Sequence, residues 1–177
     1  MPFVLIALAI ASRFLPHPPN VACVAAVGLF AGAHLTSWRA WIVPLAAMSI
    51  ADAMGTWLGL GGQGFYSPIA MAGVYAGMLS SVPLGRWIGA SSGPGRILGG
   101  TLIASTIFFV LSNLGVLFAG WYPLSFSGAV TCFVAALPFF GYSLTGDLAY
   151  SCGLFAAARL VATSTEKASV ASASVIG

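Results

Sequence analysis

The stretch Gly99–Phe118, GGTLIASTIFFVLSNLGVLF, decides the fold class of this 177-residue chain. It contains no Lys, Arg, Asp or Glu. As a helix it would be about 30 Å long, which is the thickness of the hydrocarbon core of a bilayer. A membrane β-barrel would instead need segments of about ten residues that alternate apolar with polar side chains. The stretch therefore predicts a transmembrane helix, in which every backbone hydrogen bond is satisfied internally.

The composition extends this interpretation to the whole chain. Hydrophobic residues make up 59% of it and charged residues only 5%, whereas a soluble domain carries about a quarter charged residues. So few charges cannot cover the surface of a water-soluble globule, which excludes a cytosolic enzyme, a nucleic-acid-binding protein and a disordered chain. We therefore predict an all-α integral membrane protein.

Breaks rich in Gly and Pro divide the chain into about six expected transmembrane helices. These helices are expected at residues 2–15, 21–35, 40–60, 66–84, 96–119 and 138–160. Because proline breaks or kinks a helix, residues 125–137 before Pro138 are expected to form a short interfacial or re-entrant piece. A seventh span in this region is the alternative. Residues 1–161 would form a single transmembrane domain, and residues 162–177 a flexible cytoplasmic tail.

Basic residues orient the expected bundle. With a cytoplasmic N-terminus, the basic residues that fall inside are Arg39, Arg86, Arg96, Arg159 and Lys167. Only Arg13 falls outside, and a seventh span would export two of the others. The positive-inside rule therefore favours six spans with both termini cytoplasmic. The apolar N-terminus is expected to be retained, because no Lys or Arg precedes its hydrophobic stretch as in a signal peptide.

Polar side chains gather toward the outer face of this topology. Ionisable groups inside a membrane are costly and are functional candidates. Asp52 and Asn113 lie in the outer parts of their helices, and Asp147 shares one helix face with Ser143 and Ser151. The candidate substrate-binding residues are Arg13, His17, Asn20, Asp52, Asn113, Trp121, Tyr122 and Asp147. The structural alternative is that Arg13 and Asp52 form an internal ion pair and that Asn113 joins two helices.

Small residues repeat every fourth position on the first two helices. Gly28 and Gly32 form a GxxxG motif, and Ala7 and Ala11 form an AxxxA motif. Such spacing lets helices approach closely, and the partner helix could be internal or belong to another subunit. The chain contains no P-loop and no metal-binding His or Cys motif. We therefore expect no enzymatic activity, no cofactor and no metal.

Several motifs resemble a family of small bacterial membrane proteins of unknown function that are regarded as transport proteins. The motifs are RFLPHPPN (13–20), GLFAG (28–32), the run 44–52, FFVLSNLG (108–115), WYP (121–123) and ALPFF (136–140). The resemblance covers residues 6–155. That family is in turn similar, more distantly, to the substrate-binding S components of energy-coupling factor (ECF) vitamin transporters.

This resemblance implies a six-helix bundle in the bacterial cytoplasmic (inner) membrane that binds a micronutrient near its outer face. It would dock on an ECF T component, and two partner ATPases would supply the energy. S components often dock through an AxxxA face on the first helix, which Ala7 and Ala11 match.

The leading expectation is thus a multi-pass, S-component-like protein that takes up a vitamin-like small molecule. The alternative is a non-catalytic accessory or assembly subunit of a larger membrane complex, binding lipid or pigment. The residues themselves leave open whether the ligand is a corrinoid, a flavin, a thiamine-like base or a nucleobase.

Overall fold

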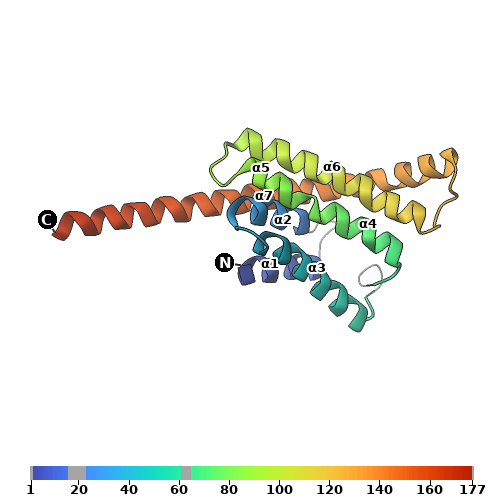
Figure 1. Ribbon diagram of the computed structural model, residues 1–177, viewed down its shortest axis with the longest axis horizontal. Helices are drawn as coiled ribbons and strands as arrows, with labels where there is room; N and C mark the ends of the chain where they lie inside the picture. The colour runs from blue at the N-terminus through green and yellow to red at the C-terminus, as the bar shows by residue number, and fades with distance from the viewer. Residues whose placement is uncertain (1, 16–22, 61–64, 177) are drawn as a thin grey trace.

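The computed structural model describes residues 2–15, 23–60 and 65–176, and this part of the chain contains helices and no strand (Figure 1). The helices are α1 (Pro2–Phe14), α2 (Val24–His34), α3 (Arg39–Trp57), α4 (Pro68–Leu79), α5 (Ser81–Ile88), α6 (Pro94–Phe118) and α7 (Phe126–Ile176). A single turn residue, Ser80, separates α4 from α5, so the two continue one another. The predicted all-α class is confirmed.

Three segments are long and apolar enough to cross a membrane. They are Pro68–Ile88, which joins α4 and α5, then α6, and the part of α7 from Phe126 to Ser164. By contrast, α1 has 13 residues and α2 has 11. At about 1.5 Å per residue these two helices are roughly 20 and 16 Å long, shorter than the hydrocarbon core of a bilayer. Of the six spans expected, three therefore have the length and apolarity to cross on their own.

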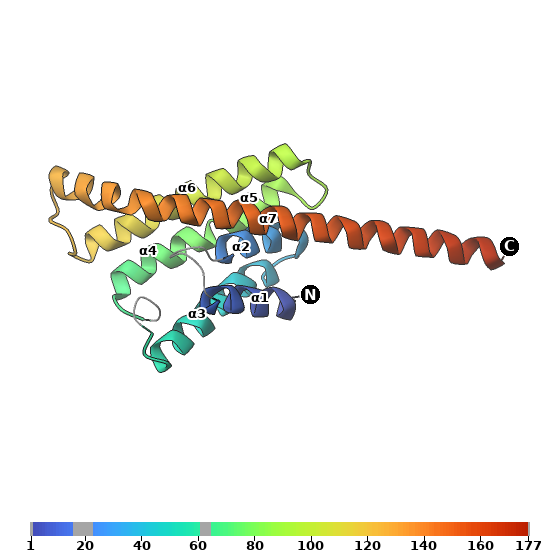
Figure 2. The same cartoon turned by 180° about the vertical axis from the view of Figure 1, so that it is seen from behind.

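The helices alternate in direction, so that both termini point toward one end of the bundle (Figures 1 and 2). At this end, the guanidinium of Arg86 donates to the carbonyl oxygen of Ser37 at 2.8 Å, and Arg159 donates to the carbonyl oxygen of Ser92. We call it the arginine end. At the opposite end the links α3–α4 and α6–α7 meet, where the ring centroids of Tyr66 and Trp121 lie 5.6 Å apart.

Glycines bring two helix pairs into close contact. Gly32 on α2 lies against α5 so tightly that an added Cβ would overlap the carbonyl of Val82, and Gly85 on α5 lies equally close to Leu29. On the other side of the bundle, an added Cβ at Gly73 of α4 would lie 2.8 Å from the Cα of Gly115 on α6. Missing side chains thus let the backbones approach, as is typical of membrane helix pairs.

The predicted break at Pro138 is wrong. α7 continues through this residue, which is exposed, just as α3 continues through Pro44. A proline removes one backbone donor, but a long helix that packs along its neighbour tolerates the loss, and α7 packs against α6 and α2. The separate interfacial piece predicted at residues 125–137 therefore does not form, because from Phe126 onward this stretch is part of the continuous helix α7.

The C-terminal segment also differs in secondary structure from the expectation. α7 remains helical to Ile176, so residues 162–176 of the predicted flexible cytoplasmic tail continue this helix. Figure 1 shows this part projecting from the bundle. The segment is rich in alanine, which has the highest helix propensity, and it contains neither glycine nor proline before Gly177.

Candidate functional site

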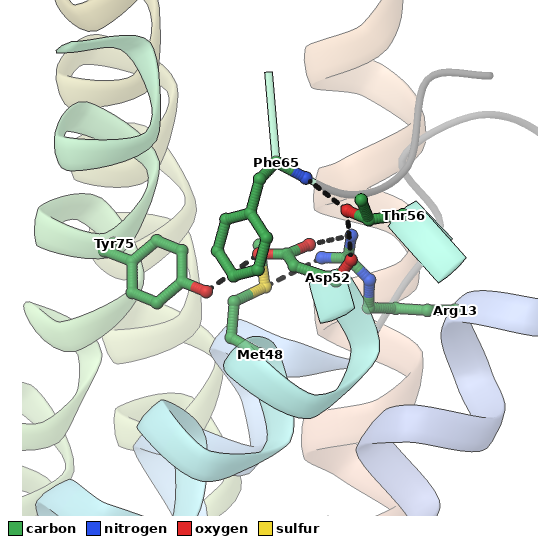
Figure 3. A network of polar contacts seen from close by, with 6 residues as sticks. All are labelled: Arg13, Met48, Asp52, Thr56, Phe65 and Tyr75. Carbon is green, nitrogen blue, oxygen red and sulfur yellow. Dashed lines mark hydrogen bonds and ion pairs between the residues drawn. The ribbon is translucent and has the colours of Figure 1, made fainter. Parts of the chain in front are cut away.

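An ion pair between α1 and α3 forms the first part of the site (Figure 3). The guanidinium Nη2 of Arg13 lies 2.7 Å from Oδ1 of Asp52, and Nη1 lies 2.7 Å from the sulfur of Met48. The hydroxyl of Tyr75 on α4 donates to Oδ2 of Asp52 at 2.8 Å. Asp52 is only 1% exposed, and a buried carboxylate of this kind needs such partners. The pair therefore ties α1, α3 and α4 together.

The end of α3 is held to the following link by a second set of bonds. The hydroxyl of Thr56 donates to the backbone carbonyl of Asp52 at 2.8 Å and accepts the N–H of Phe65 at 2.9 Å. Figure 3 shows Thr56 beside the carboxylate network. The link that carries Tyr66 is thereby anchored to the helical turn that presents Asp52.

Asp147 provides a second buried carboxylate, on α7. Its Oδ2 accepts the hydroxyl of Ser105 from α6 at 2.8 Å, and the carboxyl group lies near the backbone N–H of Ala26. Ala26 lies in the first turn of α2, where backbone donors lack partners inside the helix. The N-terminus of α2 is buried inside the bundle. Asp147 of α7 therefore places its negative end at this helix start, where a capping side chain from the residue before α2 would usually lie.

A side chain of α1 also bonds to the N-terminus of α2. The hydroxyl of Ser12 on α1 accepts the N–H of Cys23 at 3.2 Å and donates to the carbonyl of Ala9 at 2.8 Å. The Cys23 thiol also lies 3.2 Å from this hydroxyl. Cys23 is fully buried. The N-terminus of α2 is thus fixed from α1 and from α7.

Between the two carboxylates lies a cavity of about 280 Å³. Its polar lining is Arg13, Asp52, Ser112, Asn113, Ser143 and Asp147. Its aromatic lining is Tyr66, Phe108, Phe109, Phe139 and Phe140. Three methionines also line the cavity: Met48, Met71 and Met78. A concave apolar site with a few convergent polar groups is typical of small-molecule binding.

Four of the predicted site residues meet at this cavity, namely Arg13, Asp52, Asn113 and Asp147. The amide nitrogen of Asn113 donates to the carbonyl of Phe109 in its own helix at 2.7 Å, which leaves the amide oxygen and the second N–H for a ligand. The face of α7 that Asp147 shares with Ser143 and Ser151 points into the bundle, since Asp147 and Ser151 are buried. These polar groups therefore converge from α1, α3, α6 and α7.

The remaining predicted residues lie elsewhere or outside the described part. Trp121 is 58% exposed and Tyr122 is half-buried, and neither lines the cavity, because the link that carries them lies beyond the end of α6. Tyr66, which touches Trp121, takes the aromatic position instead. His17 and Asn20 lie outside the described residues.

Of the two small-residue motifs, one packs inside the bundle and the other is exposed. Gly28 and Gly32 pack against α5 of the same chain, so the expected partner-docking surface on α2 is already occupied. Ala7 and Ala11 are exposed on α1. Among the described residues, no group of three or more His, Cys, Asp or Glu side chains that could hold a metal ion comes together.

Sequence reasoning missed most of the apolar wall. Ala136, Phe139, Phe140, Ser143 and Asp147 all line the cavity at helical spacing along α7. The helix predicted from Pro138 already carries four of them on one face, and the predicted break separated only Ala136 from this set. No sequence pattern assigned the methionines to the site, although Met48 precedes Asp52 by one helical turn.

The fold and the site together define a class: an all-helical protein with three segments able to cross a membrane and an internal cavity that carries one arginine and two carboxylates. The chain belongs to a family of unknown function, DUF6580, whose family model matches residues 1–170. No curated protein and no solved structure matches it.

Proposed function

We propose that this protein is a membrane-embedded binding protein for a vitamin-like small molecule, similar in role to the S component of an ECF transporter. The observation that carries the proposal is the cavity of about 280 Å³, which brings buried ionisable side chains together inside an apolar bundle. Such groups are costly in a membrane protein and are retained where they recognise a solute or hold helices together. The size favours a compact base over a corrinoid or another macrocycle.

The arginine end supports an orientation with both termini in the cytoplasm of a bacterial cell. Three arginines there lie over tryptophan rings: Arg39 over Trp38 at 5.9 Å, Arg86 over Trp41 at 5.6 Å and Arg96 over Trp87 at 5.2 Å. Basic residues mark the cytoplasmic side, and tryptophans mark the membrane interface. This arrangement supports a multi-pass protein of the inner membrane.

The length of α3 supports a further crossing of the membrane. Trp38 directly precedes this 19-residue helix and Trp57 ends it, and both side chains are exposed. The helix is about 28 Å long, so its two tryptophans are spaced like the two interfaces of a bilayer. In this frame α3 is the fourth crossing segment, while α1 and α2 cross together with their neighbours.

The exposed face of α1 supports a membrane partner. Ala7 and Ala11 are exposed beside Val4, which is 69% exposed, and Leu8, which is 36% exposed. Small residues let a second helix approach this face closely. A T component coupled to ATPases is the partner we propose for it, which would supply the energy that a chain without a P-loop cannot obtain from ATP itself.

One observation favours the accessory-subunit alternative. The ion pair of Arg13 and Asp52 joins α1 to α3 in the way a purely structural pair would. The same pair, however, does not account for Asn113 and Asp147 on the other side of the cavity. Binding of a solute accounts for all four.

A cavity-filling substitution tests the proposal. Ala136 lines the cavity, whereas its neighbour Ala135 is exposed and does not line it. We expect the protein purified in mild detergent to release a near-stoichiometric small molecule on denaturation, identified by mass spectrometry. Ala136→Phe should abolish this compound, and the control Ala135→Phe should retain it. Recovery of lipids alone from both proteins would refute the proposal and favour the accessory subunit.

A further inference from the structure

We infer that the cavity selects a small aromatic cation and rejects carboxylates of the same size. This inference rests on the proposed function and names the chemical class of its ligand. It follows from three features of the cavity: the distribution of charge, the free acceptor capacity of one carboxylate, and the composition of the wall.

The positive charge of Arg13 in the cavity is already balanced by the carboxylate of Asp52. Among the residues that the structure describes, Arg13 is the only Lys or Arg that lines the cavity. One nitrogen of its guanidinium lies 2.7 Å from Asp52 and another lies 2.7 Å from the sulfur of Met48. An anionic ligand at Arg13 would compete with Asp52, which is 1% exposed, for this single guanidinium. Two anions against one cation leave an uncompensated negative charge, which is strongly unfavourable in a low-dielectric interior.

The carboxyl group of Asp147, by contrast, has no basic side chain paired with it among the described residues. Within the described residues, the pair of Arg13 and Asp52 is the only ion pair between side chains, so Asp147 has no basic partner there. The first turn of α2 carries only about half a positive charge as a helix dipole, which does not balance a full carboxylate. The cavity therefore contains, on the side of α7, a carboxyl group without a counter-ion, and a bound cation would supply that counter-ion and stabilise the ionised form.

Asp147 also has acceptor positions to offer. Its carboxylate accepts a hydrogen bond from Ser105 and lies near the backbone N–H of Ala26, so these two groups occupy at most two of its acceptor positions. An ionised carboxylate has about four lone-pair sites, so about two remain for a ligand donor. Because Asp147 lines the cavity and is 4% exposed, a bound cation would meet it with little competing water.

The walls suit a flat cation. Phe108, Phe109, Phe139 and Phe140 line the cavity, and the negative faces of such rings attract cations. The thioethers of Met48, Met71 and Met78 add soft, polarisable surface that packs well on aromatic ligands. The volume of about 280 Å³ holds roughly nine water-sized groups at about 30 Å³ each, which corresponds to one or two rings.

Three probes that share one ring and differ in charge test this inference: 1-methylnicotinamide (cation), nicotinamide (neutral) and nicotinate (anion). Their affinities are measured by ligand-observed NMR titration against the full chain in nanodiscs. We expect the cation to bind about tenfold or more tightly than the anion, a ratio that corresponds to about 1.4 kcal/mol. Asp147→Asn, which keeps the shape of the side chain, should bring the two affinities to within about threefold of one another.

Two controls separate the local charge from other effects. Glu166→Gln removes the same charge elsewhere on α7 and should leave the order of the probes unchanged. Ser105→Ala removes the hydroxyl bound to Asp147 but keeps its carboxylate, and should preserve the preference for the cation even if Asp147→Asn does not fold.

The outcomes distinguish this inference from the proposed function. Tightest binding of nicotinamide or nicotinate, an unchanged order in Asp147→Asn, or no binding of any probe would overturn the cation preference. The proposed function fails separately, if the purified protein releases no small molecule on denaturation. Release of an anionic compound would uphold the function and overturn the inference.

Discussion

The pair of Arg13 and Asp52 should contribute strongly to stability, and a double-mutant cycle measures how much. The guanidinium is 15% exposed and the carboxylate 1% exposed, with 2.7 Å between the bonded atoms. Asp52→Asn leaves the arginine without its counter-ion, and Arg13→Gln leaves the carboxylate without its own. Removing one partner of a buried pair costs about 3–5 kcal/mol.

The double variant should be less destabilised than the sum of the two single variants, because neither charge is then left unpaired. We expect a coupling energy of about 3 kcal/mol between the two positions. For a chain of this size, each single substitution should lower the thermal midpoint by about 6–20 °C, at about 2–4 °C per kcal/mol.

The assay is thermal unfolding of the purified protein in mild detergent, followed by circular dichroism. Tyr75→Phe serves as the control, because it removes only the hydrogen bond to Asp52, which is worth about 1 kcal/mol. Effects of Arg13→Gln and Asp52→Asn that add to within about 0.5 kcal/mol would show that the two charges do not interact, and would refute the reasoning.

Three further predictions follow from the helix contacts and the orientation. Gly73→Ala should lower stability by about 1–3 kcal/mol through overlap with α6, whereas Gly99→Ala, in open space on α6, should raise it by about 0.4–1 kcal/mol; equal thermal midpoints would contradict the close crossing. Pro138→Ala should slow amide hydrogen exchange around residues 134–142, since it restores a helical donor in α7; faster exchange would indicate that the proline supports the local structure. In a cysteine-free background, an impermeant maleimide should label Ser127→Cys on intact cells and Ser91→Cys only after lysis, both positions being exposed; the reverse pattern would place the arginine end outside the cell.

Helix positions followed from the sequence because they depend on local features. The breaks rich in Gly and Pro gave helix ends within a few residues of those observed for α1, α2, α3 and α6. The break at Pro138 failed because proline removes only one backbone bond, and the packing of α7 on α6 and α2 outweighs that loss. Whether a proline ends a helix is thus decided by contacts that lie far away in the sequence.

The candidate site was predictable in its charged members and not in its wall. Arg13, Asp52 and Asp147 were identifiable because ionisable residues are rare in so apolar a chain. The phenylalanines and methionines of the cavity are indistinguishable in the sequence from the many apolar residues that face lipid or neighbouring helices. Only the direction in which each helix presents them separates the two groups.

The sequence by itself determined that the protein is helical and apolar, because a chain with 5% charged residues satisfies its backbone in lipid only by local hydrogen bonds. The tertiary structure decided which polar groups are partners. It joined Arg13 to Asp52 and placed Asp147 on the first turn of α2. It also turned the GxxxG motif of α2 inward against α5. The physical reason is that ion pairs, helix caps and glycine contacts act over a few ångströms between helices, and their pairing depends on how the helices pack rather than on spacing along the chain.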